Sequence, residues 1–102
     1  MTIRHVVLFK FQPQAEVARV EAAFAALPGA IAEIASFEWG TNNSPEGLDH
    51  GFTHCFTLGF KDAAARDAYL VHPDHQAFST LARPNVAEVL VIDYETRTES
   101  SR

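Results

Sequence analysis

Residues 3–11 read Ile-Arg-His-Val-Val-Leu-Phe-Lys-Phe, and their side chains alternate with the period of two that is typical of a β-strand. One side of this strand carries a single histidine among apolar residues: Ile3, His5, Val7, Phe9 and Phe11. The other side is also half apolar, because Val6 and Leu8 stand between Arg4 and Lys10. A strand with apolar side chains on both sides predicts a sheet that is covered on both faces.

Further elements follow this strand in a regular order. The spacing predicts a helix over 15–27, stopped by Pro28-Gly29 and followed by one more helical turn over 30–34. Strands are predicted over 36–41, 52–60 and 88–95, with a loop at 42–51 that is rich in turn residues. Two more helices are expected, one over 63–71 capped by Asp62 and one that begins at Pro73 and ends near Arg83-Pro84.

The order strand, helix, strand, strand, helix pair, strand defines the fold class. We predict an α+β domain of ferredoxin-like βαββαβ topology, whose four-stranded, mostly antiparallel sheet carries its helices on one face. At 102 residues the chain has the size of one domain, which we place at 1–97, and residues 98–102 are expected to form a frayed tail.

Composition excludes several classes of partner. The net charge is −5, and Lys and Arg are scattered singly, which argues against nucleic acid or an anionic membrane surface. No apolar run approaches the ~20 residues of a membrane span, and the first residues lack the pattern of a signal peptide. The single cysteine, Cys55, allows no disulfide within the chain, so we expect a cytoplasmic protein.

The face of the sheet that the helices leave open is expected to be apolar. It would carry side chains from three strands: Val6, Leu8, Cys55, Leu90, Ile92 and Tyr94. Such a patch usually marks an interaction site, and a second copy of the chain is its simplest cover. We therefore predict a homodimer formed through the sheet faces; the alternative is a single crowded strand with a few exposed apolar residues.

Histidines and one acid are in phase with the core. His5 and His54 alternate with buried strand residues, and His75 lies three residues before Phe78 on the second helical unit. Asp93 alternates with Val91, which places a carboxylate in the same layer, where it needs a partner; one of these histidines is the nearest candidate. We expect Phe9, Phe24, Phe56 and Phe78, with His54, to form the wall of a pocket.

Two interpretations of these residues remain open. A histidine bonded to a carboxylate can act as a general acid or base near neutral pH, and Tyr69 beside it could donate to a developing enolate. Alternatively, the same pairs only anchor helices to the sheet. A metal site made by His5, His54, His75 and Asp93 is a further alternative, but no spacing demands it, so we expect no metal. The sequence also has no glycine-rich phosphate loop, and we expect no cofactor.

Several of these segments resemble one known family. The first strand, Trp39-Gly40, residues 51–54, the run Tyr-Leu-Val-His-Pro-Asp-His at 69–75 and residues 91–94 are similar to the stress-responsive dimeric α/β-barrel (Dabb) domain. The resemblance implies a ferredoxin-like protomer whose dimer closes a barrel from two sheets. Most members have no established activity, so the role of a Dabb dimer is not fixed by its fold.

One plant member of this family is a polyketide cyclase, and the match to it implies roles for four residues. His75 would be the base, Tyr69 the oxyanion donor, Asp93 the acid that supports His75, and His5 a pocket histidine. The resemblance thus implies an aldol-type cyclisation of a small carbonyl compound. The alternatives are a non-catalytic stress-responsive or ligand-binding dimer and, by analogy of fold alone, an oxygen-dependent monooxygenase.

Overall fold

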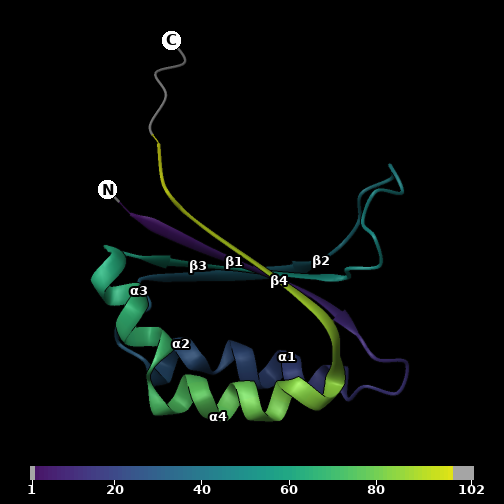
Figure 1. Cartoon of the computed structure of the whole chain (residues 1–102), viewed down its shortest axis with the longest axis horizontal. Coiled ribbons are helices and arrows are strands. Elements are labelled where there is room, and N and C mark those ends of the chain that lie inside the picture. Colours follow the sequence, from purple (N-terminus) through teal and green to yellow (C-terminus); the bar gives the residue numbers. More distant parts are fainter. Residues whose placement is uncertain (1, 98–102) are drawn as a thin grey trace.

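The computed structural model describes residues 2–97, so the predicted tail at 98–102 lies outside the described residues. The elements follow the predicted order (Figure 1). The strands are β1 (Ile3–Phe11), β2 (Ser36–Thr41), β3 (His54–Phe60) and β4 (Val86–Glu95). The helices are α1 (Val17–Ala25), α2 (Leu27–Ala30), α3 (Ala63–Leu70) and α4 (Pro73–Ala82), with a short 3₁₀ turn at Arg83–Asn85.

The four strands form one sheet in the order β2-β3-β1-β4, and every neighbouring pair is antiparallel, which confirms the predicted topology. The register between β1 and β4 places His5 directly opposite Asp93 and Val7 opposite Val91. Residues that face each other in an antiparallel pair project on the same side of the sheet. The register alone therefore brings a histidine and a carboxylate together on one face.

All helices lie on one face of the sheet (Figure 1). The core between these two layers is aromatic: Phe24 of α1 stacks on Phe56 of β3 at a ring-centroid distance of 4.2 Å, and Phe78 of α4 lies 4.5 Å from Phe24. Burying these side chains contributes on the order of 2–3 kcal/mol each. This packing fixes the distance between α4 and the sheet.

The predicted bounds of the first two helical segments were wrong. The first helix ends at Ala25, and Pro28-Gly29 lies inside α2 instead of terminating a helix. Proline fits there because the first turn of a helix needs no backbone donor at that position. The extra turn expected over 30–34 is therefore displaced toward residue 27, while the Asp62 cap is confirmed by its hydrogen bond from the Ala65 backbone N–H at 2.8 Å.

The other face of the sheet carries exposed apolar side chains. On β4, Ile92 is 53% exposed and Tyr94 51%, and Leu90 is exposed beside them. On β1 the neighbouring Val6 and Leu8 are half-buried. Among the described residues no helix covers this face, and the loop between β2 and β3 rises on the same side (Figure 1). The prediction of a sheet with two apolar faces is confirmed.

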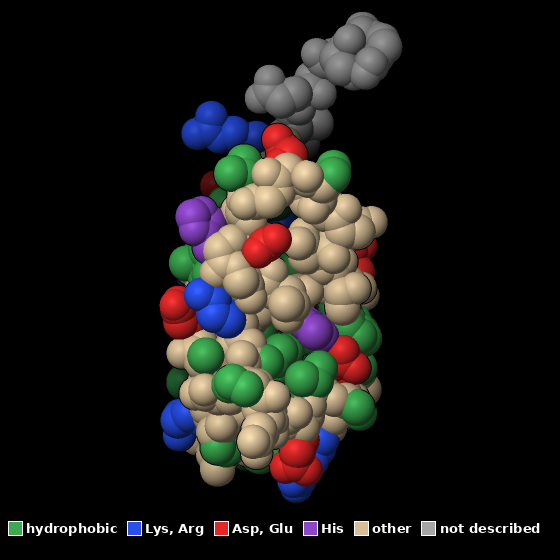
Figure 2. Space-filling model, turned by 90° about the vertical axis from the view of Figure 1, so that its right-hand side faces the viewer, with side chains coloured by type: hydrophobic (Ala, Val, Ile, Leu, Met, Phe, Trp, Pro, Cys, Tyr) green, Lys and Arg blue, Asp and Glu red, His purple; other side chains and the backbone are tan. Residues whose placement is uncertain are grey.

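Charged side chains of both signs stand singly over the end of the molecule that carries the β2–β3 loop (Figure 2). No large patch of one sign forms on that end. Within residues 2–97, none of the helices has the length and apolar character needed to cross a bilayer.

Candidate functional site

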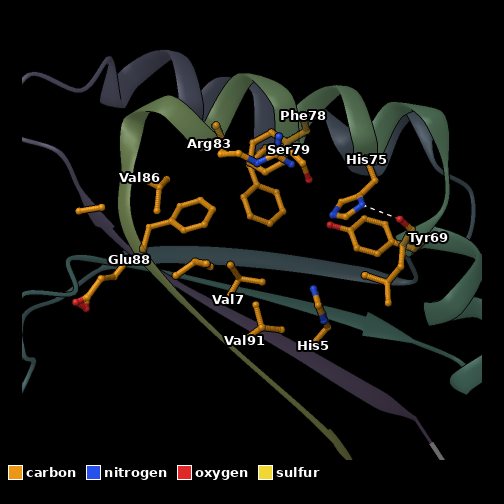
Figure 3. A pocket seen from close by; sticks show the side chains of 16 residues that line it. His5, Val7, Tyr69, His75, Phe78, Ser79, Arg83, Val86, Glu88 and Val91 are labelled. Carbon is orange, nitrogen blue, oxygen red and sulfur yellow. Dashed lines mark hydrogen bonds between the residues drawn. The ribbon is translucent and has the colours of Figure 1, made fainter.

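A cavity of about 410 Å³ lies between α4 and the β1–β4 half of the sheet (Figure 3). Its wall is mainly apolar, with aromatic side chains from Phe9, Phe24 and Phe78. Val89 and Val91 of β4 face the helix side, yet Val89 is 55% exposed. Because the helices do not extend over β4, the cavity is open along this strand.

His5 lines the cavity from the sheet. It is buried on β1, and its Nδ1 lies 2.7 Å from Asp93 Oδ1. Since a carboxylate accepts hydrogen bonds, His5 Nδ1–H is the donor in the neutral imidazole, and Nε2 carries the free lone pair. The ring projects upward from the sheet toward Tyr69 and His75 (Figure 3).

His75 lines the cavity from the helix layer. Its Nδ1 donates to the Leu70 carbonyl at 3.0 Å, shown by the dashed line in Figure 3, so its Nε2 also carries a lone pair. Leu70 is the last residue of α3, where backbone carbonyls lack partners within the helix. Because α4 begins at Pro73, His75 lies in its first turn, close to the Leu70 carbonyl. Burial lowers the pKa of His75, the hydrogen bond to Leu70 partly offsets this, and nearby His5 lowers it further.

Tyr69 lies between these two histidines. Its ring centroid is 5.7 Å from that of His5 and 4.4 Å from that of His75, and the side chain is buried. Burial, followed by the negative charge of Asp93, raises the pKa of Tyr69 far above its usual value of 10. The phenol therefore stays protonated and can donate a hydrogen bond into the cavity.

The expectation that Asp93 supports His75 was wrong. Asp93 bonds to His5 through Oδ1, and its second oxygen, Oδ2, accepts from Arg66 Nη1 at 2.9 Å. The reason is the register: β4 pairs with β1, which places Asp93 opposite His5 on the sheet and not beside His75 on α4. The support of His75 is the backbone carbonyl of Leu70.

Two predicted wall residues lie elsewhere. His54 Nε2 pairs with Glu21 Oε2 of α1 at 2.7 Å, and Phe56 is fully buried in the aromatic core. Neither lines the cavity, and the proposed grouping of His54 with His5, His75 and Asp93 around a cation does not form. In residues 2–97 no set of three or more His, Cys, Asp or Glu residues is placed to hold a metal ion.

Sequence reasoning missed four polar wall or support residues: Arg66, Ser79, Arg83 and Glu88. Ser79 and Arg83 follow His75 at intervals of four on α4 and the turn after it, so the helical spacing that placed Phe78 could have found them. Arg66 had no such signal, because its contact with Asp93 depends on how α3 packs against β1 and β3.

The lowered pKa of His75 predicts how its charge responds to pH. The folded state holds the neutral imidazole more firmly than the unfolded state, so His75 is expected to stay neutral as pH falls through 6.5 and to take a proton only below it. Because the unfolded chain takes this proton first, the free energy of unfolding starts to decrease as pH falls below 6.5, and this loss is complete once pH has fallen through the folded-state pKa. Proton NMR titration of the His75 ring checks this; a midpoint above 6.5 would contradict it.

Together these side chains offer acid–base chemistry inside an apolar cavity. Two histidines whose Nδ1 atoms are hydrogen-bonded leave their Nε2 atoms for the cavity, and one phenol presents a proton donor. Such a set can remove a proton from a carbon acid and stabilise the resulting oxyanion. The fold and the cavity thus define a ferredoxin-like α+β protein with a cavity, open along β4, of a size suited to small molecules.

The Stress responsive A/B Barrel Domain (Dabb) family matches residues 3–96, and the chain belongs to this family. HS1 of Arabidopsis thaliana, a stress-response A/B barrel domain-containing protein, is 33% identical over 101 residues, covering 96% of this chain and 93% of HS1. Olivetolic acid cyclase of Cannabis sativa is 25% identical over 100 residues, covering 95% of this chain and 99% of the cyclase.

Solved structures show the same fold. The crystal structure of At3g17210 from Arabidopsis thaliana superposes with a TM-score of 0.90 at 32% identity, covering 96% of this chain and 98% of that one. A dimeric ferredoxin-like protein of unknown function from Jannaschia sp. gives 0.83 at 27% identity, covering 94% and 100%. The hydroxynitrile lyase of Passiflora edulis gives 0.88 at 23% identity, covering 97% of both chains, and shows likeness of fold alone.

Proposed function

We propose that this protein catalyses proton transfer at a carbon next to a carbonyl group in a small, largely apolar compound. The observation that carries the proposal is the meeting of two histidine lone pairs and one phenol on a single apolar cavity. The similarity to olivetolic acid cyclase supports it, because that relative's name describes a ring closure and 95% of this chain aligns with it.

In the proposed step, His75 Nε2 takes the proton from the carbon. The electrons of the broken C–H bond form a carbon–carbon double bond, and the carbonyl electrons move to the oxygen, which becomes an enolate stabilised by the Tyr69 hydroxyl. Protonated His75 can then return the proton. In a substrate with a second carbonyl, the enolate carbon attacks it, and His75 delivers its proton to the new alkoxide.

The test uses the wild-type protein and measures hydrogen exchange instead of a product. Small methyl ketones and β-diketones, both aromatic and aliphatic, are incubated in heavy water, and NMR records the loss of the protons next to the carbonyl. We expect exchange faster than in buffer and faster than with imidazole at the same histidine concentration. Compounds that bind, as seen in their shift of Tm, but exchange no faster than in buffer would contradict catalysis and favour a non-catalytic binding module.

We further propose that two copies pair through their open sheet faces. The exposed apolar residues of β4 support this, as does the dimeric relative from Jannaschia. In such a pair the Ile92 side chain would be covered, so Ile92→Asp would bury one unpaired carboxylate per copy. We expect the Kd of the dimer to rise at least about 100-fold, which corresponds to a loss of ~3 kcal/mol in the free energy of association.

Light scattering over a range of concentrations checks this prediction by the mass of the particle. The matched control is Val71→Asp, which adds the same charge at an exposed apolar residue after α3, away from the sheet face. The control should keep the wild-type mass. An unchanged mass for Ile92→Asp, or a monomeric wild type, would contradict the sheet-face dimer.

A further inference from the structure

His5, the cavity histidine on the sheet, is one of three side chains that are linked by hydrogen bonds. Arg66 on α3 donates from Nη1 to Asp93 Oδ2 at 2.9 Å, and Asp93 Oδ1 accepts from His5 Nδ1 at 2.7 Å. Arg66 and Asp93 are each 22% exposed at the side chain, while His5 is buried. One carboxylate therefore links a cation near the surface to an imidazole in the cavity wall.

We infer that Arg66 is a positioning residue for the site: it occupies the second oxygen of Asp93 and thereby keeps His5 neutral, with Nε2 unprotonated and facing the cavity. This inference rests on the proposed function, which needs a cavity lined by neutral histidines. Arg66 itself does not line the cavity.

The physical argument starts from the carboxylate. A partly buried carboxylate with only one partner favours the doubly protonated imidazolium, because an opposite charge stabilises the charged form of a histidine. Imidazolium carries a proton on Nε2 and has no lone pair there. Arg66 supplies the positive charge instead, so the carboxylate is neutralised without a second proton on His5.

The other groups around His5 do not replace this cation. His5 faces the Tyr69 ring of α3 and the neutral His75 of α4. On β3, Leu58 lies opposite His5, and the ring centroid of Phe60 is 6.3 Å from that of His5. The pKa of Arg66 is raised by its hydrogen bonds to Asp67 and then to Asp93, so the guanidinium stays charged at every working pH.

The test reads the state of His5 directly. Nitrogen-15 NMR separates a protonated from an unprotonated Nε2, and it needs neither substrate nor turnover. At neutral pH the wild type is expected to show unprotonated Nε2. In Arg66→Met the His5 Nε2 signal is expected to move to the protonated position in most molecules.

Two variants control for a structural effect. Arg66→Lys keeps the charge and can reach one oxygen, so it should restore the wild-type signal in most molecules. Arg19→Met removes one positive charge from α1, where Arg19 Nη1 pairs with Glu16 Oε2 at 3.5 Å, and should leave the signal unchanged.

An unchanged Nε2 signal in folded Arg66→Met would overturn the inference, as would a signal that moves equally in Arg66→Lys. If the protein exchanges no carbon-bound protons at all, the proposed function fails, but the NMR result still decides the role of Arg66. Ring signals of Trp39 and His54 at wild-type positions show that each variant is folded, because these rings stack on each other near Phe9, four residues along β1 from His5.

Discussion

Replacing His75 by glutamine is expected to lower the rate of carbon-proton exchange by about 10²–10⁴-fold, the usual contribution of a general base. Glutamine is close in size and can still donate its amide to the Leu70 carbonyl that His75 now contacts at 3.0 Å. It has no basic nitrogen, so the proton acceptor is lost while the helix start is kept. We expect Tm to change little, since His75 is only partly buried.

The matched control is His50→Gln, because His50 is an exposed residue of the β2–β3 loop and does not line the cavity. Exchange by this variant should equal that of the wild type. Equal losses of exchange rate in both variants would show that the effect does not depend on the position of the histidine, and would contradict a specific role for His75. A loss of folding in His75→Gln with no effect on exchange per folded molecule would assign His75 a structural role.

The loss in His75→Gln should also vanish at low pH. Because its pKa is lowered, wild-type His75 remains a base down to below pH 6.5 and is then protonated. At still lower pH the two proteins should exchange at similar rates. A pH profile of the ratio between them therefore separates a base from a residue that only shapes the cavity.

The period of two in the strands and the spacings of three and four in the helices predicted most of the scaffold. Alternation in residues 3–11 placed His5 inward, and the interval between His75 and Phe78 placed His75 over the same layer, as the structure confirms. The reverse apolar face was also predicted correctly from alternation. These features depend on local geometry, which each strand or helix carries by itself.

Pairings between elements could not be predicted in the same way. Whether Asp93 meets His5 or His75 depends on the register of β4 against β1, and a shift of one residue would have sent Asp93 to the other face. His54 shares the alternation of His5, but its strand lies next to β2 and under α1, so Glu21 becomes its partner. Periodicity reports the face of a residue and not its neighbours along that face.

Replacing Tyr69 by phenylalanine is the second variant with a large expected effect. It removes one hydroxyl and keeps the ring, whose centroid lies 5.2 Å from that of Phe60 and 4.4 Å from that of His75. Loss of one donor to a developing oxyanion typically costs about 10²–10³-fold in rate. We expect that loss in carbon-proton exchange, with ligand binding weakened far less, because the negative charge develops only during the reaction.

The control is Tyr94→Phe, the same change at the chain's other tyrosine, on the open sheet face, and its exchange should match the wild type. Because the pKa of Tyr69 is raised above 10, its phenol is protonated at every working pH, so the rate ratio of wild type to Tyr69→Phe should stay constant between neutral pH and pH 9. A ratio that falls toward one as pH rises would show a tyrosine that ionises in this range, and would argue against a neutral donor. An unchanged rate in Tyr69→Phe would remove Tyr69 from the mechanism and leave the two histidines to stabilise the enolate.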